Sequence, residues 1–156
     1  MYLAVVVALI FVLPSLSALA EAVVFHAPLV LALLGKWFVF WFVGVRLFLA
    51  GLRQVAQPRY TAHVILGLKS DAPLVLVREL GFANLAVGSV GLASVPVPGW
   101  RVAAALAGGI FYALAGINHA LRPHRNRLEN IAMTSDLLAG ALLLAGCARA
   151  LSTSQS

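Results

Sequence analysis

Long apolar runs, separated by short polar or proline-containing segments, are the main pattern along this chain. Each run approximates the ~20 residues that a helix needs to cross the hydrocarbon core of a bilayer. The runs predict transmembrane helices at about residues 3–20, 28–53, 73–94, 100–121 and 129–150. Helices are expected because lipid offers the backbone no hydrogen-bond partner. The predicted fold class is therefore all-α, a polytopic membrane helix bundle of about five transmembrane helices.

The first run leaves the number of spans open. It ends in Ala18-Leu19-Ala20, which is similar to a signal-peptide cleavage site, but Met1-Tyr2-Leu3 lacks the basic residues that begin such a signal. We therefore expect a retained first helix with a kink at Pro14, and four spans if this segment does not cross the membrane. Residues 23–34 fit a helical extension, an interfacial helix or part of a re-entrant turn.

The composition identifies the helices as those of a membrane protein. Of the 156 residues, 62% are hydrophobic and only 10% are charged. An ordinary soluble domain is about 45–50% apolar and about 25% charged, and a soluble fold of this length could not bury so much apolar surface. The lipid bilayer is thus the expected partner of a single domain that covers residues 1–156.

The basic charge of the chain indicates its orientation in a membrane and not nucleic-acid binding. The net charge is +6, and Lys and Arg occur singly or in the connections between apolar runs. The connections 54–72 and 122–128 carry an excess of basic residues, whereas 95–99 has none. By the positive-inside rule, these two connections and the N-terminus are predicted to be cytoplasmic. Lys36 and Trp37 then lie at the opposite interface.

Arg46 is the most unexpected residue of the second run. It lies seven residues before Arg53, which places it ~10 Å inside the membrane in a straight helix. An arginine at that depth usually faces the interior of the bundle beside a partner, although its long side chain can also reach the headgroups. Because Glu79 and Asp136 fall at a similar depth, we predict that Arg46 pairs with one of them or with both.

Other polar residues extend this layer near the cytoplasmic side. Gly109, Tyr112, Gly116 and His119 recur on one face of the fourth helix, where glycines permit close packing. The predicted polar layer comprises Arg46, Glu79, Asn84, Tyr112, Asn118, His119 and Asp136. It fits a salt-bridge network that fixes helix register, a polar pocket for a headgroup, quinone or small solute, or a proton or ion pathway.

The sequence carries no motif of known catalytic or cofactor chemistry. The single Cys147 excludes an intrachain disulfide and a cysteine redox pair, and the histidines show no metal-ligand spacing. We predict no catalytic residue, no metal and no resident cofactor, although a quinone or a lipid would suit the polar layer. The aromatic segment 37–42 favours an interfacial belt over a cofactor-stacking wall.

Several motifs carry a resemblance: Lys36–Trp41, Gly44–Phe48, Arg78–Asn84, Gly116–His119 and Asn126–Asn130. They resemble a family of small bacterial integral-membrane proteins known only as a domain of unknown function, over roughly residues 36–140. The stretch 79–84 is also loosely similar to DoxX-like four-helix membrane proteins, some of which are implied to be subunits of quinone-linked or thiol-linked oxidoreductase systems. The first resemblance implies a bacterial inner-membrane protein, and neither transfers functional residues.

These observations favour a small-ligand-binding protein or accessory subunit, with the polar layer as its site and Arg46 as the anion-binding or charge-compensating group. One alternative is a structural or assembly protein that binds another membrane protein, or a second copy of itself, through its glycine stripes and aromatic surfaces. Another is a proton-coupled transporter or membrane enzyme that acts through Glu79 and His119. The sequence favours a protein that is not an enzyme without deciding the question.

Overall fold

The computed structural model describes residues 2–153, and these form helices joined by short connections without any strand. The first span consists of α1 (Tyr2–Val7), η1 (Ala8–Val12) and α2 (Leu13–Val24), and the second of α3 (Leu31–Phe38), η2 (Val39–Val45) and α4 (Arg46–Ala56). The remaining elements are η3 (Tyr60–Ile65), α5 (Leu74–Ala93), η4 (Pro98–Trp100), α6 (Arg101–Ala120) and α7 (Arg127–Thr153). Three of the short segments, η1, η2 and η3, are π-helical.

The predicted membrane helices are confirmed. Five helices are long and apolar enough to cross a membrane: Leu3–Val24, Leu31–Ala56, Leu74–Ala93, Pro98–Ala120 and Arg127–Ser152. The first is one continuous helix that extends beyond its predicted end, and residues 25–30 form a non-helical connection to α3. At the predicted kink, Pro14 lies in the first turn of α2 directly after the π-helical turn η1, where its missing N–H is tolerated.

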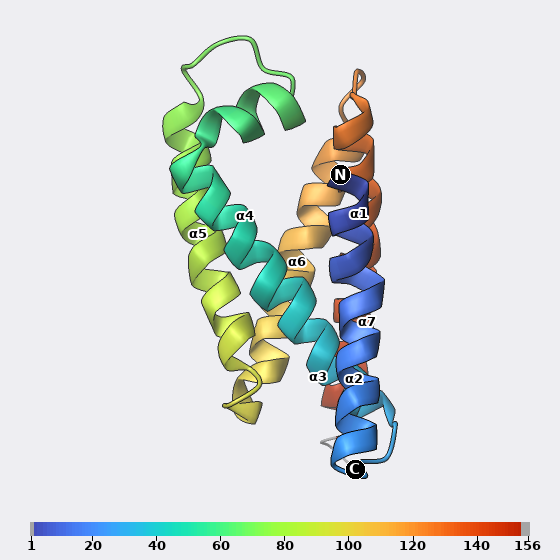
Figure 1. The fold of residues 1–156 in the computed structure, drawn as a ribbon. Coiled ribbons are helices and arrows are strands. Elements are labelled where there is room, and N and C mark those ends of the chain that lie inside the picture. The colour runs from blue at the N-terminus through green and yellow to red at the C-terminus, as the bar shows by residue number, and fades with distance from the viewer. Residues whose placement is uncertain (1, 154–156) are drawn as a thin grey trace.

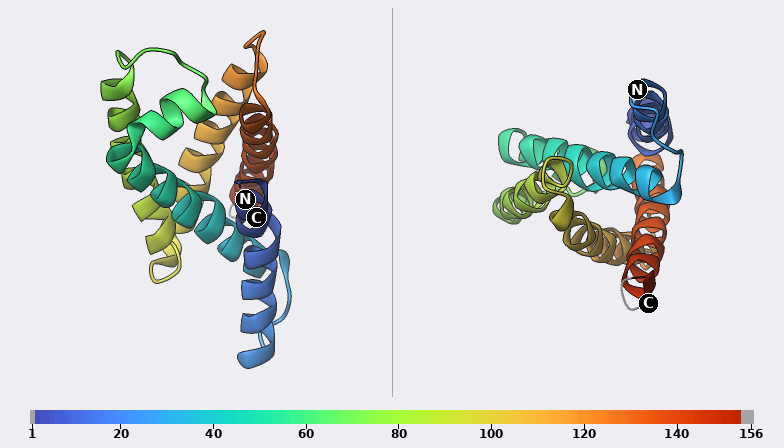
Figure 2. Two further views of the ribbon diagram at one scale, coloured as in Figure 1. Left: turned by 45° about the horizontal axis from the view of Figure 1, so that its top comes forward. Right: turned by 90° about the horizontal axis from the view of Figure 1, so that it is seen from below.

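The helices associate mainly as two pairs, α4 with α5 and α6 with α7, while the first span packs against α3, η2 and α7 (Figures 1 and 2). The start of α1 and the end of α7 lie toward opposite ends of the bundle, as an odd number of spans requires (Figure 1). Between the pairs is a core that includes Ile10, Phe42, Val43, Tyr112 and Leu143. Large exposed apolar side chains such as Leu16, Leu76 and Leu114 would face lipid.

Glycines bring the backbones of α4 and α5 into direct contact. A Cβ atom added at Gly51 would lie 2.7 Å from the carbonyl oxygen of Gly81, and one at Gly88 would lie 2.5 Å from the Phe48 nitrogen. Gly44 and Gly91 face each other in the same way. The glycines of these two helices therefore form packing surfaces within the chain.

The α6–α7 pair uses the same device. A Cβ atom at Gly116 would lie 2.7 Å from Leu137 Cγ, and one at Gly140 would lie 2.7 Å from the Ala113 nitrogen. Gly109 contacts Leu144 in the same interface. Both helix pairs thus rely on close approach of small residues, which replaces the hydrophobic effect as a source of association in lipid.

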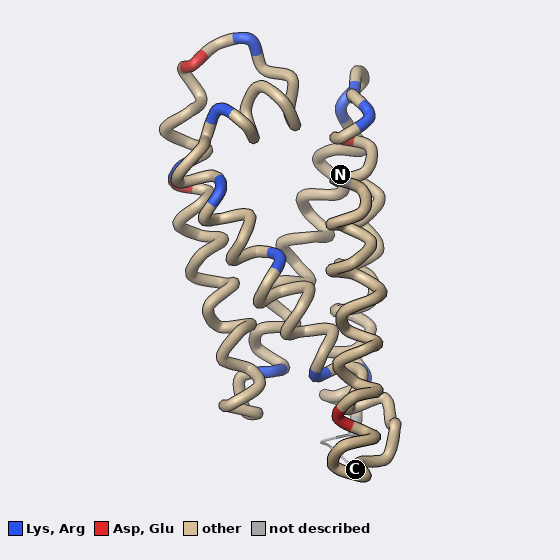
Figure 3. The backbone as a smooth tube through the Cα atoms, viewed as in Figure 1, with Lys and Arg blue, Asp and Glu red and all other residues tan. Residues whose placement is uncertain are grey.

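Charged residues gather unevenly along the bundle (Figure 3). We call the end that carries the connections 57–73 and 121–126 the basic end. It holds most of the cations, which lie in these connections or in the helix turns next to them: Arg53, Arg59, Lys69, Arg78, Arg122, Arg125 and Arg127. The opposite ends of the helices carry Lys36, Arg101 and Arg149, with Glu21 as the carboxylate among them. Arg46, the first residue of α4, lies between these two ends along the second span, ten residues after Lys36 and seven before Arg53.

Candidate polar site within the helix bundle

Arg46 is held between three spans. Its Nη2 donates to Asp136 Oδ1 at 2.5 Å and to Ser135 Oγ at 2.8 Å, both on α7. The guanidinium carbon also lies 4.7 Å from the centre of the Tyr112 ring of α6, a cation–π distance. Asp136 is thus the carboxylate that pairs with Arg46, as one form of the prediction stated. The side chains of both residues are nearly buried, at 12% and 11% exposed.

The π-helical turn η2 lies directly before Arg46 and is held by a contact with Tyr112. The backbone N–H of Arg46 bonds to Trp41 O, one residue further back than in an α-helix. The Tyr112 hydroxyl donates to the carbonyl oxygen of Phe42 in that same turn at 2.6 Å. Tyr112 therefore fixes the widened turn with its hydroxyl and supports the arginine with its ring. Turns of this kind often mark functional sites in helices.

A second cluster lies at the basic end and centres on Glu129, a residue outside the predicted polar layer. Its carboxylate is 1% exposed, forms an ion pair with Arg122 at 2.7 Å and lies 3.0 Å from His119 Nδ1. Asn126 Oδ1 accepts from the Glu129 backbone N–H and so caps the first turn of α7. The His119 side chain is 13% exposed, and its carboxylate partner is Glu129.

Asn84 takes part in a separate contact between α4 and α5. Its Nδ2 donates to Gln54 Oε1 at 2.8 Å, and both residues are buried. The Asn84 Oδ1 atom is buried and accepts no hydrogen bond from the described residues. This contact crosses the glycine-packed interface, so it does not join the Arg46 cluster.

Glu79 and Asn118 are exposed, and no hydrogen bond or ion pair joins either to another described residue. The reason is helical geometry, since neighbouring residues are rotated by about 100°. Glu79 is two positions from the packed Gly81, hence on the opposite face of α5. Asn118 has the same relation to Gly116 on α6. Arg46 likewise lies two positions from Gly44, so it points away from α5 and cannot meet Glu79.

The connection between the second and third spans is itself folded by charges. His63 Nδ1 lies 2.6 Å from Leu68 O, and its Nε2 lies 2.9 Å from Asp71 Oδ1. Arg59 binds the second carboxylate oxygen of Asp71 at 2.6 Å. The bonds to Leu68 and then Asp71 raise the pKa of His63, while Arg59 and then His63 lower the pKa of Asp71. Because both His63 nitrogens face acceptors, the imidazolium form satisfies both.

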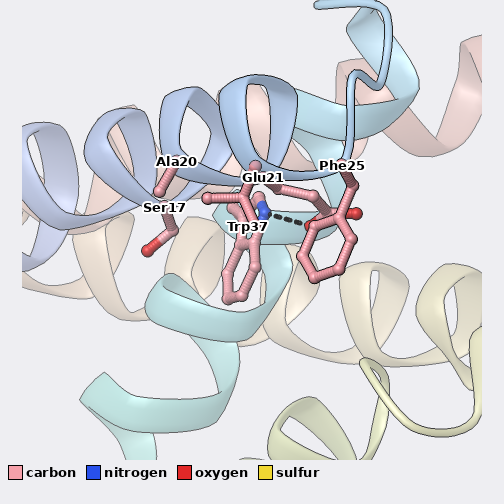
Figure 4. A pocket seen from close by; sticks show the side chains of 6 residues that line it. Ser17, Ala20, Glu21, Phe25 and Trp37 are labelled. Carbon is pink, nitrogen blue, oxygen red and sulfur yellow. Dashed lines mark hydrogen bonds between the residues drawn. The ribbon is translucent and has the colours of Figure 1, made fainter.

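The opposite end of the bundle carries a polar contact that joins the first two spans (Figure 4). Glu21 accepts from Lys36 Nζ at 2.6 Å and from Trp37 Nε1 at 2.8 Å, and Trp41 Nε1 donates to Ser17 at 3.0 Å. A shallow cleft of about 280 Å³ lies over Glu21 and Trp37. The aromatic segment 37–42 therefore packs partly onto the first helix, with Phe42 fully buried.

A larger groove of about 430 Å³ runs between the first span and α7. The first span contributes Leu3, Val6, Val7, Ile10 and Phe11, all apolar, and α7 adds the apolar Ile131 and Leu138. The polar side of the groove is formed by Arg127, Asn130, Thr134 and Ser135. Since Ser135 also accepts from Arg46, the groove and the Arg46 cluster share one side chain.

Of the predicted site residues, Arg46, Tyr112 and Asp136 lie together in one cluster. His119 belongs to a second cluster with Glu129, and Asn84 to a third contact with Gln54. Sequence reasoning missed Ser135, Glu129 and Gln54, each of which binds a predicted residue. The usable signal was helical spacing, because Glu129 and Asp136 lie seven residues apart and so on one face of α7. Among residues 2–153 no group of three His, Cys, Asp or Glu side chains is placed to hold a metal ion.

Comparison with known proteins identifies a family for the chain, and the function of that family is unknown. The model of the family of unknown function DUF6790 matches residues 1–150. No curated protein and no solved structure matches the chain.

Proposed function

We propose, for a chain that belongs to the DUF6790 family of unknown function, the role of a membrane-embedded protein that binds a small amphiphilic molecule. The binding site is the groove between the first span and α7, with Ser135 and the Arg46–Asp136 pair behind its polar side. The molecule enters from the membrane, and the chain acts alone or as an accessory subunit. The bacterial inner membrane, with a cytoplasmic N-terminus, remains the proposed location.

The observation that supports this role is the continuity between the groove and the Arg46 cluster. The first span lines the groove with apolar side chains such as Val6 and Ile10, which suit a hydrocarbon chain, whereas Asn130 and Ser135 of α7 offer hydrogen-bonding groups. Binding sites for small molecules are mostly apolar with a few polar groups that fix orientation. A lipid or a quinone has this division.

The assembly alternative loses part of its support. The glycines at positions 44, 51, 81, 88 and 91 are occupied by contacts between α4 and α5, and those at 109, 116 and 140 by contacts between α6 and α7. They are therefore not open to a partner protein. The transport alternative relied on Glu79 together with His119, and these side chains belong to different surfaces of the bundle.

Native mass spectrometry on protein extracted from its own membranes in mild detergent tests the proposal. We expect a bound small molecule on the wild type and its loss in Leu138→Trp, since the indole would fill the groove. Leu142→Trp is the matched control, because Leu142 lies one turn further along α7, is 46% exposed and does not line the groove. A bound mass that survives Leu138→Trp, or no bound mass on the wild type, would overturn the proposal.

A second variant tests the part played by the polar cluster. Arg46→Leu combined with Asp136→Leu removes both charges and leaves neither orphaned. If the pair shapes the binding site, the folded double variant should hold the small molecule less tightly than the wild type. If the double variant retains the small molecule as the wild type does, the Arg46–Asp136 pair serves only to fix the register of the helices.

A further inference from the structure

We infer that the amphiphile bound in this groove is an anionic phospholipid whose headgroup sits at Arg127. This inference rests on the proposed function and adds the chemical class of the ligand. It is carried by the way hydrogen-bond donors, acceptors and apolar groups are distributed along the groove.

The end of the groove nearest the basic end offers donors. Arg127 begins α7, is exposed, lines the groove and forms no ion pair with any carboxylate in the described range 2–153. Asn130, one turn further on, receives Arg125 Nε at its Oδ1, which fixes the amide and leaves its NH₂ group to donate. A guanidinium and an amide NH₂ at the mouth of one groove are complementary to a phosphate.

The middle of the groove offers acceptors only. The Thr134 hydroxyl donates to Asn130 O at 3.0 Å, and the Ser135 hydroxyl donates to Ala132 O at 2.8 Å. With their protons engaged, these hydroxyls present oxygen lone pairs. An anionic group would not settle there, so the geometry assigns negative charge to the Arg127 end.

The far part of the groove is apolar and long enough for part of an acyl chain. Arg127 and Leu138 are eleven residues apart on one helix, which corresponds to ~16 Å. Ile10 and Phe11 line the same part from the first span. A phospholipid would therefore place its phosphate at the basic end of the bundle and its chain toward the membrane centre. The neighbouring cations Arg122 and Arg125 are engaged with Glu129 and with carbonyl oxygens, which leaves Arg127 for the phosphate.

The inference is tested by adding phosphatidylglycerol or phosphatidylcholine of the same acyl chains to delipidated protein and measuring retention by native mass spectrometry. We expect phosphatidylglycerol to be preferred, and Arg127→Gln to weaken its retention roughly fivefold, the effect of one basic side chain at an anionic lipid surface. Arg78→Gln is the control, because Arg78 is an exposed arginine of the same end that does not line the groove. Far-UV circular dichroism would verify that each variant is folded.

The outcomes separate this inference from the proposed function. Equal retention of the two lipids, or equal losses in Arg127→Gln and Arg78→Gln, would overturn the anionic-lipid inference. A bound uncharged molecule that Leu138→Trp removes and Arg127→Gln spares would also overturn it, yet would support the proposed function. No small molecule on the wild type in either experiment would overturn both.

Discussion

The second span has two faces that are held by different physical means. Toward α5 it presents Gly44 and Gly51, whose backbones touch the neighbouring helix, and a single neutral amide contact between Gln54 and Asn84. Toward α6 and α7 it presents Arg46, which is held by charge and hydrogen bonds. The first face depends on shape and the second on complementary charge. The shape-dependent face should therefore be sensitive to added volume, and the charged face to the loss of one partner.

Removing one charge from the second face should have the largest effect. Asp136→Leu would leave the Arg46 guanidinium buried without its carboxylate, and breaking a buried pair in this way costs about 3–5 kcal/mol. Unfolding in detergent, followed by far-UV circular dichroism, would measure this loss. Arg46→Leu combined with Asp136→Leu should recover most of the stability, because no orphan charge remains. A double variant as unstable as the single one would contradict an energetic role for the pair.

Adding volume to the first face should have the next largest effect. In Gly44→Ala the new methyl group would lie 2.8 Å from the Leu92 nitrogen, so the helices must move apart. Overpacking of this kind typically costs about 1–3 kcal/mol. Gly146→Ala is the matched control on α7, where nothing lies within 4 Å of the new atom. The same unfolding assay should show the control at or above wild-type stability, and equal losses would refute shape as the basis of this face.

The contact between His63 and Asp71, in the connection between the second and third spans, should make local stability depend on pH. The pKa of His63 is raised, so its contribution is fully present below its ordinary value of 6.5 and is lost as pH rises through the raised value. The pKa of Asp71 is lowered, so its contribution is present above its ordinary value of 3.8 and is lost as pH falls through the lowered one. Hydrogen exchange of residues 66–72, corrected for intrinsic rates, should therefore accelerate as the pH rises above 6.5 and through the raised pKa of His63. His63→Gln should remove that pH dependence; an unaltered profile would reject the His63 contact as its source.

The smallest effects are expected for the polar residues that face away from both interfaces. Glu79→Gln and Asn118→Leu should each change stability by less than about 0.5 kcal/mol, because both side chains are exposed and contact no described partner. Ligand retention in native mass spectrometry should also be unchanged in both. A clear loss in Glu79→Gln would indicate a role for this carboxylate beyond the contacts of this bundle.

The sequence determined the fold class and the number of membrane-spanning helices, while their ends shifted by a few residues, as in Leu3–Val24 and Leu31–Ala56. In lipid, the backbone N–H and C=O groups of a run of about 20 apolar residues are hydrogen-bonded only if the run is a helix. The five spans therefore follow from length and hydropathy alone. Helical spacing also contained the orientation of Glu79 and Asn118, because each is two residues from a glycine of the packed face. The same spacing predicts that His119 faces inward, and in the structure His119 lies beside the buried Glu129.

The tertiary structure decided which polar residues meet. Depth in the membrane suggested two carboxylate partners for Arg46. Depth alone, however, does not determine which way a side chain points around the helix axis or which helices are neighbours. The close contact of Gly44 with Gly91 places α5 on one side of the second span, and the π-helical turn η2 directs Arg46 to the other. The Arg46–Asp136 contact joins residues far apart in sequence and forms only when the helices pack together. The same holds for the groove that Ile10 and Leu138 line. Hydropathy sets each helix in the membrane, whereas the choice of partner depends on packing between helices.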